Sequence, residues 1–276
     1  MKKEYSILVN SCDAYADVWP LFFQALNFYW PNSKEFKIYL NCESVKEEKY
    51  SDVIFLNSEK LNRKDQWGRR FIGALKKIDN DFILILLDDY ILEDYVNEDR
   101  INDSLRILKN NPDIAACYLK KTTAKVCQKV EDFCKIEDYE DYRLNTGPAL
   151  WRKTHLLNLL RDIDNPWAWE VFGSYRTFGS GIEFIEPHGD DIYKYASTQG
   201  GAIYRGKWVK SVIEKFNNIE KIDIDFGKRG FSDEQVYEKR SFKWKLNFLI
   251  LGYKMVGWKI IYFFKYYIKN KFKVYL

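Results

Sequence analysis

One stretch of the sequence, Phe82-Ile83-Leu84-Ile85-Leu86-Leu87-Asp88-Asp89-Tyr90, runs six apolar residues directly into two adjacent carboxylates. An apolar run of this length without alternation is typical of a strand covered on both faces, as in the middle of a largely parallel sheet. Such sheets bind ligands at the carboxyl ends of their strands, so Asp88 and Asp89 fall where a site would be built. Adjacent carboxylates repel each other unless a positive group lies between them, and a divalent cation that bridges to a phosphate is the usual one.

The segments around this stretch alternate between strand and helix patterns. Hydrophobic spacing predicts strands at 5–10, 36–40 and 53–56, and a helix at 18–29. This order favours a Rossmann-like α/β fold, a mixed, mostly parallel sheet flanked by helices, over a β-sandwich. Further along the chain we expect helices at 65–78, 98–110 and 155–160, strands at 114–119 and 181–185, and an irregular excursion at 120–143.

The composition is that of a globular protein. Of 276 residues, 46% are hydrophobic and 17% aromatic, which suits one large α/β domain or two small ones and suggests stacking surfaces in addition to a core. The five cysteines are odd in number and show no CxxC spacing. They therefore argue against a disulfide framework or a zinc site and favour a reducing cytoplasm.

Positive charge is concentrated near the C-terminal end. Residues 241–276 hold eight lysines and no acidic residue. Because the whole chain has a formal net charge of +4, removing those eight charges leaves −4 for residues 1–240. A nucleic-acid binder would spread its positive charge over the folded surface, so nucleic acid is not an expected partner.

Three basic residues are candidates for contact with a diphosphate. Arg70 begins a helix whose apolar stripe faces the sheet, which puts it near the strand ends; alternatively, it is a solvated arginine paired with Asp65 or Asp79. Arg205 and Lys207 lie on a glycine-containing turn that suits pyrophosphate oxygens.

A pair of tryptophans precedes a carboxylate in Asn165-Pro166-Trp167-Ala168-Trp169-Glu170. The turn-forming Asn-Pro suggests that Trp167 and Trp169 make a rigid wall on which an acceptor sugar stacks, with Glu170 pointing at it. The alternative is a core aromatic pair, with Glu170 capping the next helical turn.

His188 is one of only two histidines and follows the predicted strand at 181–185. Together with the carboxylate pair it would complete a metal site; alternatively, it is a solvated loop side chain.

The sequence resembles bacterial glycosyltransferases of the GT-A fold, of the kind that build capsular polysaccharide or lipopolysaccharide. The order and spacing of the matching pieces carry the resemblance, which spans Tyr5 to Trp208. The pieces are the first strand with Ser11-Cys12-Asp13-Ala14-Tyr15-Ala16-Asp17-Val18-Trp19, the Trp67 helix leading to Leu86-Leu87-Asp88-Asp89-Tyr90, Pro166-Trp167-Ala168-Trp169-Glu170, and Gly206-Lys207-Trp208.

This resemblance implies roles for single residues. Asp13 and Tyr15 lie where such enzymes hold the base and ribose of a nucleotide. Asp88 and Asp89 take the place of the Asp-x-Asp motif, which binds ribose and the diphosphate-bound cation, here Mn²⁺ or Mg²⁺. Glu170 falls where an inverting enzyme has its general base.

The adjacent aspartates depart from the spaced pair of the family, so a metal requirement stays open. A few GT-A enzymes neutralise the leaving diphosphate with basic side chains instead. Arg70, Arg205 and Lys207 are the residues that would do so in this chain.

The expected activity is that of a hexosyltransferase that moves a sugar from a UDP-sugar to a lipid-linked saccharide in capsule, O-antigen or lipopolysaccharide biosynthesis. A sugar hydroxyl is a poor nucleophile at neutral pH, so a carboxylate such as Glu170 must take its proton. The charge that develops on the departing diphosphate must be stabilised as well. The alternatives are a nucleotidyltransferase, a nucleotide-sugar hydrolase, and a non-catalytic saccharide-binding subunit of the assembly machinery.

Residues 231–276 are expected to form a basic, aromatic tail behind a catalytic domain at 1–230. Lys243, Lys254 and Lys265 recur every eleven residues, about three helical turns, and so share one face of a helix. Because lysines interrupt every apolar window long enough to cross a bilayer, the pattern does not predict a transmembrane span.

The tail instead predicts an amphipathic helix, or a helix pair hinged near Gly252 or Gly257, in the headgroup layer of an anionic membrane. Ser232 and Gln235 have the spacing of a capping box before it. Residues 241–276 would thus hold the protein at the cytoplasmic face of the cell membrane, where lipid-linked acceptors are found. The alternative is a helix packed on the domain with a solvated lysine face.

Overall fold

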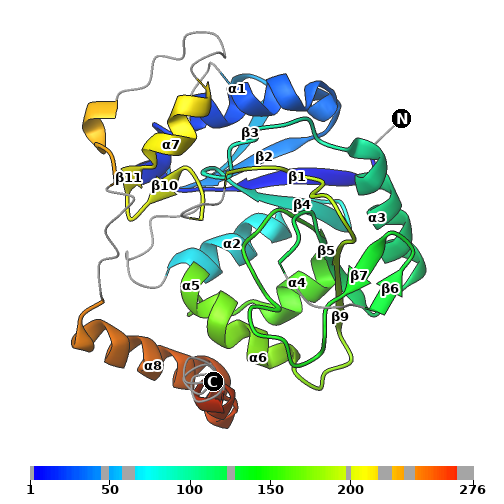
Figure 1. Ribbon diagram of the computed structural model, residues 1–276, viewed down its shortest axis with the longest axis vertical. Helices are drawn as coiled ribbons and strands as arrows, with labels where there is room; N and C mark the ends of the chain where they lie inside the picture. Colours follow the sequence, from blue (N-terminus) through cyan, green and yellow to red (C-terminus); the bar gives the residue numbers. More distant parts are fainter. Residues whose placement is uncertain are drawn as a thin grey trace.

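The computed structural model describes residues 3–44, 50–57, 66–122, 128–196, 200–216, 226–232 and 240–265. Within them, nine strands form one mixed sheet in the order β3-β2-β1-β4-β8-β5-β9-β7-β6 (Figure 1). The strands are β1 (Tyr5–Asn10), β2 (Ile38–Cys42), β3 (Val53–Asn57), β4 (Phe82–Leu87), β5 (Ile114–Tyr118), β6 (Gln128–Val130), β7 (Phe133–Lys135), β8 (Ala149–Arg152) and β9 (Glu183–Pro187), with a separate hairpin of β10 (Ile203–Tyr204) and β11 (Lys207–Trp208).

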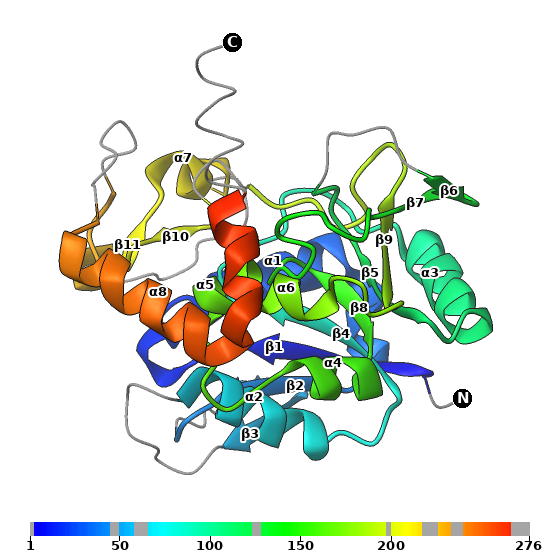
Figure 2. The same ribbon diagram turned by 90° about the horizontal axis from the view of Figure 1, so that it is seen from below.

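Helices cover both faces of the sheet, as Figures 1 and 2 show. Side chains of α1 and α3 pack into the core on one face, and side chains of α2 and α4 pack into the core on the other. The helices are α1 (Trp19–Tyr29), α2 (Gln66–Lys76), α3 (Glu98–Asn110), α4 (Lys153–Leu159), α5 (Pro166–Ala168), α6 (Ser174–Thr177), α7 (Lys210–Ile213) and α8 (Phe242–Val256).

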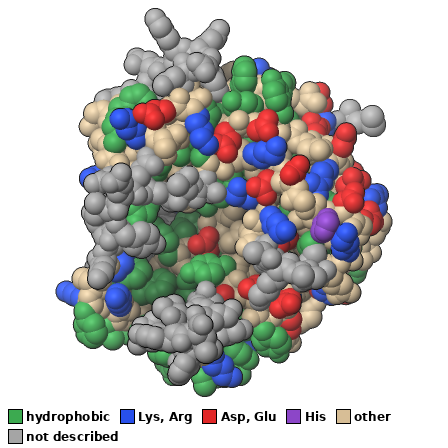
Figure 3. Space-filling model, viewed as in Figure 1, with side chains coloured by type: hydrophobic (Ala, Val, Ile, Leu, Met, Phe, Trp, Pro, Cys, Tyr) green, Lys and Arg blue, Asp and Glu red, His purple; other side chains and the backbone are tan. Residues whose placement is uncertain are grey.

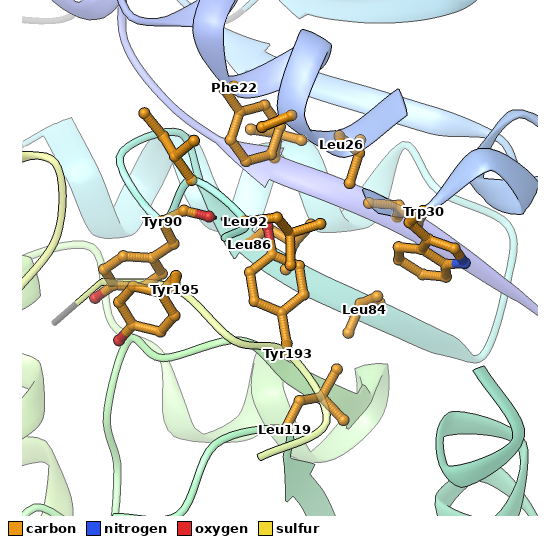
Figure 4. Close-up of a cluster of buried hydrophobic side chains, with 14 of the residues drawn as sticks. Phe22, Leu26, Trp30, Leu84, Leu86, Tyr90, Leu92, Leu119, Tyr193 and Tyr195 are labelled. Carbon is orange, nitrogen blue, oxygen red and sulfur yellow. Dashed lines mark hydrogen bonds between the residues drawn. The ribbon is translucent and has the colours of Figure 1, made fainter. Parts of the chain in front are cut away.

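β4 lies in the middle of the sheet, as its unbroken apolar sequence predicts. Ile83 and Ile85 face the core under α2 and α4, whereas Leu84 and Leu86 face the core under α1. Figure 4 shows Leu84 and Leu86 on the strand below α1, the helix that contributes Phe22 and Leu26. Since both faces of the strand are covered, every position of β4 has a reason to be apolar.

The register of β4 fixes the position of the two carboxylates. β4 pairs in parallel with β1, from Tyr5 opposite Phe82 to Asn10 opposite Leu87. The residues that follow the two strands therefore emerge side by side at one edge of the sheet. On its other side, β4 pairs with β8 in the antiparallel direction.

Two parts of the sheet differ from the expectation. The segment 120–143, expected to be irregular, contains the β6–β7 hairpin, and β7 pairs with β9 at the far end of the sheet. β8, for which no strand was predicted, is inserted between β4 and β5. Both depend on pairing with strands distant in sequence, which the local pattern does not reveal.

The tail packs on the domain. α8 begins where the Ser241 hydroxyl accepts a hydrogen bond from the Trp244 N–H (3.2 Å), and it ends at Gly257, whose φ is +56°. Its inner side chains join those of α5 and α6 in a third apolar cluster. Gln235 and residues 266–276 lie outside the described residues. In the described part of the chain, no helix is both long and apolar enough to cross a membrane.

Candidate functional site

Asp88 is buried beneath the edge of the sheet, only 4% exposed. It accepts hydrogen bonds from the Ser11 hydroxyl, which follows β1, and from the indole N–H of Trp19 (3.3 Å), which begins α1. Burial raises the pKa of Asp88 to about 7, although these two hydrogen bonds act in the opposite direction. Asp88 is therefore the inner carboxyl of the pair, held by neighbouring elements.

Asp89 is the outer carboxyl and is partly exposed. Burial, and after it the charge of Asp88, raise the pKa of Asp89 well above its usual range. The chain passes close beside it: the Ala202 N–H donates to the Asp89 carbonyl oxygen (2.8 Å), and a Cβ on Gly201 would lie 2.9 Å from the Asp89 carboxylate. Glycine at position 201 thus keeps this carboxylate uncovered.

Arg205 and Lys207 lie on the β10–β11 hairpin and are exposed. Arg205 and Gly206 form its two-residue turn with φ values of 50° and 84°, as expected for a type I′ turn. The hairpin starts at Ala202, which is bonded to Asp89, so both basic residues extend from the segment beside the carboxylates.

Arg229 is a basic residue of this region that the sequence reasoning missed. Its guanidinium bonds to both carboxylate oxygens of Asp17 (2.6 and 2.7 Å), donates to the Gly206 carbonyl oxygen (3.3 Å) and lies over the Tyr15 ring. Burial alone would raise the pKa of Asp17, but the hydrogen bonds from Arg229 and Lys228 and the charge of Arg229 together lower it. Arg229 comes from a distant segment with no recognisable motif, so no local pattern marks it.

Asp13, expected to contact a nucleotide, bonds to the end of β2. Its carboxylate accepts hydrogen bonds from the N–H groups of Glu43 (2.9 Å) and Ser44 (3.0 Å). Glu43 in turn accepts a hydrogen bond from the almost buried Arg70. Arg70 therefore lies near the strand ends, as expected. It is buried and ion-paired with Glu43, not solvated and not paired with Asp79; Asp65, the other predicted partner, lies outside the described residues.

Glu170 lies in a π-helical turn at Trp169–Gly173, directly after α5. Its carboxylate accepts two hydrogen bonds from Thr146, one from the N–H (2.8 Å) and one from the hydroxyl (2.7 Å). Burial raises the pKa of Glu170, against the effect of those bonds. Thr146 thus fixes the carboxyl group by hydrogen bonds and not by an ion pair. A carboxyl group with a raised pKa in a fixed position suits proton transfer near neutral pH.

Tyrosines connect the two carboxyl sites. The Tyr90 hydroxyl lies 3.1 Å from the Thr146 hydroxyl, which bonds Glu170. Its ring stacks on Tyr195 with centroids 4.3 Å apart, and Figure 4 shows the two rings side by side. Because Tyr90 follows Asp89 directly, one short segment links the outer aspartate to the Glu170 network.

The two tryptophans separate into different environments. Trp169 is 2% exposed and packs against Trp151 and Trp67, with ring centroids 5.9 and 6.0 Å apart, so it is a core residue and not part of a sugar-stacking wall. Trp167 is 63% exposed and keeps a free face for stacking. The buried position of Trp169 matches the alternative interpretation of this motif.

His188 does not join the aspartates. It follows β9, which lies three places from β4 in the sheet, roughly 14 Å at 4.8 Å per strand. Its backbone N–H donates to the Asp132 carbonyl oxygen (3.0 Å), and its side chain is exposed. The expectation that His188 binds the same metal is therefore wrong.

No group of three or more His, Cys, Asp or Glu side chains among the described residues is arranged to hold a metal ion. The remaining donors, Asp88 and Asp89, provide oxygen ligands of the kind that Mg²⁺ and Mn²⁺ prefer. They fit a cation that completes its coordination with phosphate oxygens and water. Cys134 is disulfide-bonded, which the odd cysteine count and the absence of CxxC spacing did not predict, whereas Cys12, Cys42 and Cys117 are not in disulfides.

The surface is hollowed on the face seen in Figure 3. In the orientation of Figure 1 the hollow lies between the β10–β11 hairpin and α8, and its visible floor is largely hydrophobic with an acidic side chain in it.

No protein-family model and no curated protein sequence matches this chain. Among solved structures, it is similar to residues 1–349 of S. aureus TarS in complex with UDP-GlcNAc: TM-score 0.50, 13% identity, covering 93% of this chain and 82% of that one. The UDP complex of the same TarS fragment matches with TM-score 0.48 and 14% identity over 71% of this chain and 60% of that one. A Leptospira borgpetersenii cytidylyltransferase matches with TM-score 0.41 and 13% identity over 70% and 79% of the two chains.

Of these matches, only the TarS complex with UDP-GlcNAc has a TM-score high enough to support a conclusion. Because its sequence identity is 13%, that conclusion concerns the fold alone. The protein thus has the mixed α/β fold, a mostly parallel sheet flanked by helices, that the sequence predicted. The chain spans 60% of the TarS fragment in its UDP complex and 36% of the longer TarS structure.

Proposed function

We propose that this protein is a glycosyltransferase that moves a sugar from a nucleotide-diphosphate donor, a UDP-sugar, to an acceptor hydroxyl. The observation that carries the proposal is the pairing of Asp88 and Asp89 at the end of β4 with a separately held carboxyl, Glu170, connected through Tyr90 and Thr146. The similarity of fold to TarS, whose structure was determined with UDP-GlcNAc, supports the choice of donor.

On the donor side, Asp89 faces the diphosphate and Asp88 supports it from below. A divalent cation, Mn²⁺ or Mg²⁺, would supply positive charge to the departing diphosphate when held by Asp89. Tyr15 and Asp13, at the neighbouring end of β1, are assigned to the nucleoside. Among the basic residues, Arg205 and Lys207 are exposed on the hairpin beside the carboxylates and are assigned to the phosphate oxygens, whereas Arg70 is ion-paired with Glu43.

On the acceptor side, Glu170 takes the proton of the attacking hydroxyl. As the new bond forms between that oxygen and the anomeric carbon, the bond from the anomeric carbon to the diphosphate oxygen breaks, and UDP leaves with the bonding electrons. The raised pKa of Glu170 favours this role, because a general base works best when its pKa lies near the working pH. Trp167 is the candidate for stacking on the acceptor sugar.

The acceptor class is inferred from α8. Lysines and large apolar side chains share its outer surface, a combination that suits the headgroup layer of an anionic membrane. We therefore propose a lipid-linked saccharide acceptor at the cytoplasmic membrane face, in the synthesis of a cell-surface polysaccharide. Exposed on α8 are Phe242, Leu246, Ile250 and Tyr253, together with Lys243, Lys245 and Lys254; the helical turns that follow α8 expose Trp258, Ile261, Phe264 and Lys265.

The test is product analysis with the full chain. UDP-sugars are supplied with and without a membrane lipid extract, and UDP, UMP, free sugar and lipid-bound sugar are quantified. Release of UDP that requires the extract and matches the sugar gained by lipid supports the proposal. Free sugar or UMP without acceptor indicates a hydrolase, pyrophosphate from a nucleoside triphosphate and a sugar phosphate indicates a nucleotidyltransferase, and absence of nucleotide binding indicates a non-catalytic subunit.

A further inference from the structure

The turn that carries Glu170 is held from two sides. Trp169, just before Glu170, is buried in the core under the sheet. Phe172, two residues after Glu170, is fully buried on the other side, in the cluster formed with α8. A π-helical turn is an irregular piece of backbone and needs such support from its surroundings.

The support from α8 depends on Gly252. A Cβ at this position would lie 2.5 Å from two carbons of the Phe172 ring, closer than any real contact. The same ring packs on Phe248 of α8 and on Phe263 beyond it, with centroids 4.8 and 5.5 Å apart. Glycine is unfavourable inside a helix, and this close approach gives a packing reason for it.

The backbone of the turn transmits this contact to Glu170. The Ser174 hydroxyl donates to the Glu170 carbonyl oxygen (2.5 Å) and accepts from the Leu144 N–H (2.9 Å), two residues before Thr146. A displacement of Phe172 would therefore move Glu170 relative to Thr146, which provides both hydrogen bonds to its carboxylate.

We propose that Gly252 and Phe172 form a positioning contact through which α8 sets the place and proton affinity of Glu170. The inference rests on the proposed role of Glu170 as general base. It makes the tail part of the catalytic arrangement, because the helix whose outer surface is assigned to the membrane holds the catalytic turn with its inner surface.

The experiment replaces Gly252 by alanine in the full chain. We expect kcat to fall about 10- to 100-fold with KM for the donor unchanged, since small displacements of a catalytic group cost rate. The acidic limb of the kcat–pH profile shifts, and amide hydrogen exchange of residues 169–173 increases. Gly73→Ala in α2 is the matched control, because no atom lies within 4 Å of its added Cβ; it should leave all three measurements unchanged.

Rescue makes the test specific. Phe172→Leu shortens the ring that the new methyl group meets, so the double variant Gly252→Ala/Phe172→Leu should recover kcat and exchange towards wild type. Should Gly252→Ala not fold, Phe248→Ala loosens the same contact by deletion and should produce the same changes.

Wild-type kcat and wild-type exchange in Gly252→Ala, or in Phe248→Ala where that variant is used, would overturn the positioning role. The role would also be overturned if kcat and exchange of Gly252→Ala/Phe172→Leu were no closer to wild type than those of Gly252→Ala. If the wild-type protein transfers no sugar, the proposed function fails, and hydrogen exchange alone still decides whether α8 fixes the turn. If Glu170→Gln loses transfer but Gly252→Ala does not, the function stands and the positioning contact fails.

Discussion

The guanidinium carbon of Arg229 lies 4.5 Å from the centre of the Tyr15 ring, so a C-terminal segment closes over the loop that follows β1. Burial raises the pKa of Asp88 and Asp89, and Arg229 is the cation whose charge opposes that effect at both. Its contact with Tyr15, which we assign to the nucleoside, and its electrostatic effect on the two carboxylates make Arg229 a candidate donor-binding residue.

We expect Arg229→Ala to weaken UDP binding by roughly 10- to 100-fold, the equivalent of one charge-assisted hydrogen bond. Calorimetric titration of UDP measures this. Arg106→Ala is the matched control, since Arg106 is an exposed, ion-paired arginine of α3 and should leave UDP binding unchanged. Equal UDP affinity in wild type and Arg229→Ala would remove Arg229 from the donor site.

Glu170→Gln should lower kcat by about 10² to 10⁴, the usual contribution of a general base, while UDP binding stays the same. Because burial raises the pKa of Glu170, the wild-type kcat should rise with pH along a limb above the ordinary glutamate value of about 4.3. Steady-state kinetics from pH 4 to pH 9 check both points. A variant with wild-type kcat would show that another group accepts the proton.

Asp88→Asn should stabilise the protein above neutral pH and leave stability nearly unchanged at low pH. The pKa of Asp88 is raised to about 7, so its protonated form is favoured in the folded state. In the wild type, the free-energy cost of ionising the buried Asp88 is absent below about pH 3.9, the pKa of an aspartate in the unfolded chain. It is present in full above pH 7. We expect a gain of about 1–3 kcal/mol at pH 8.

Thermal unfolding of both proteins at pH 4.5 and pH 8 measures this difference. Asn can still accept the hydrogen bond from Ser11 or Trp19, so the contacts of Asp88 are largely kept. If the gain in Tm of Asp88→Asn over the wild type is the same at both pH values, or larger at pH 4.5, Asp88 is not a buried carboxyl with a raised pKa.

Replacing exposed aromatics of the tail should abolish membrane binding. Phe242 and Trp258 are 82% and 71% exposed, so Phe242→Ser/Trp258→Ser should fold normally and lose flotation with anionic vesicles. High salt should weaken flotation of the wild type, because the lysine contribution is screened. Tyr95→Ser, which changes an aromatic of the domain that is 61% exposed, is the control and should float like wild type.

Substitution is a better test than removal of the tail. Without α8, the buried Phe172 and Tyr175 would lose the partners that cover them, and a truncated chain would expose new apolar surface. Equal flotation of the wild type and the double variant would show that the exposed aromatics do not bind membrane.

The sequence predicted the centre of this fold because the relevant signals are local. The bounds of β4 are those of the six apolar residues Phe82 to Leu87. The bounds of α3 are those of the helix that hydrophobic spacing predicted at 98–110. The place of β8 beside β4, in contrast, results from pairing across the sheet, and three apolar residues followed by Arg152 do not encode a partner.

The site was predictable where a residue directly follows a strand. Asp88, Asp89 and Asp13 lie at the expected edge because strand ends determine their position. The predictions for Trp169 and His188 failed for a different reason. Whether a tryptophan faces solvent depends on how α5 packs, and which strand ends lie together depends on the order of the strands in the sheet. Arg229 carries no local signal at all.

The most direct test of the account is calorimetric titration of UDP, with and without Mn²⁺, into the wild type and Asp89→Asn. We predict that the wild type binds UDP and binds it more tightly with Mn²⁺, and that Asp89→Asn loses the gain that Mn²⁺ provides. A wild type with no affinity for UDP under either condition, or an Asp89→Asn variant that binds as the wild type does, would contradict the account.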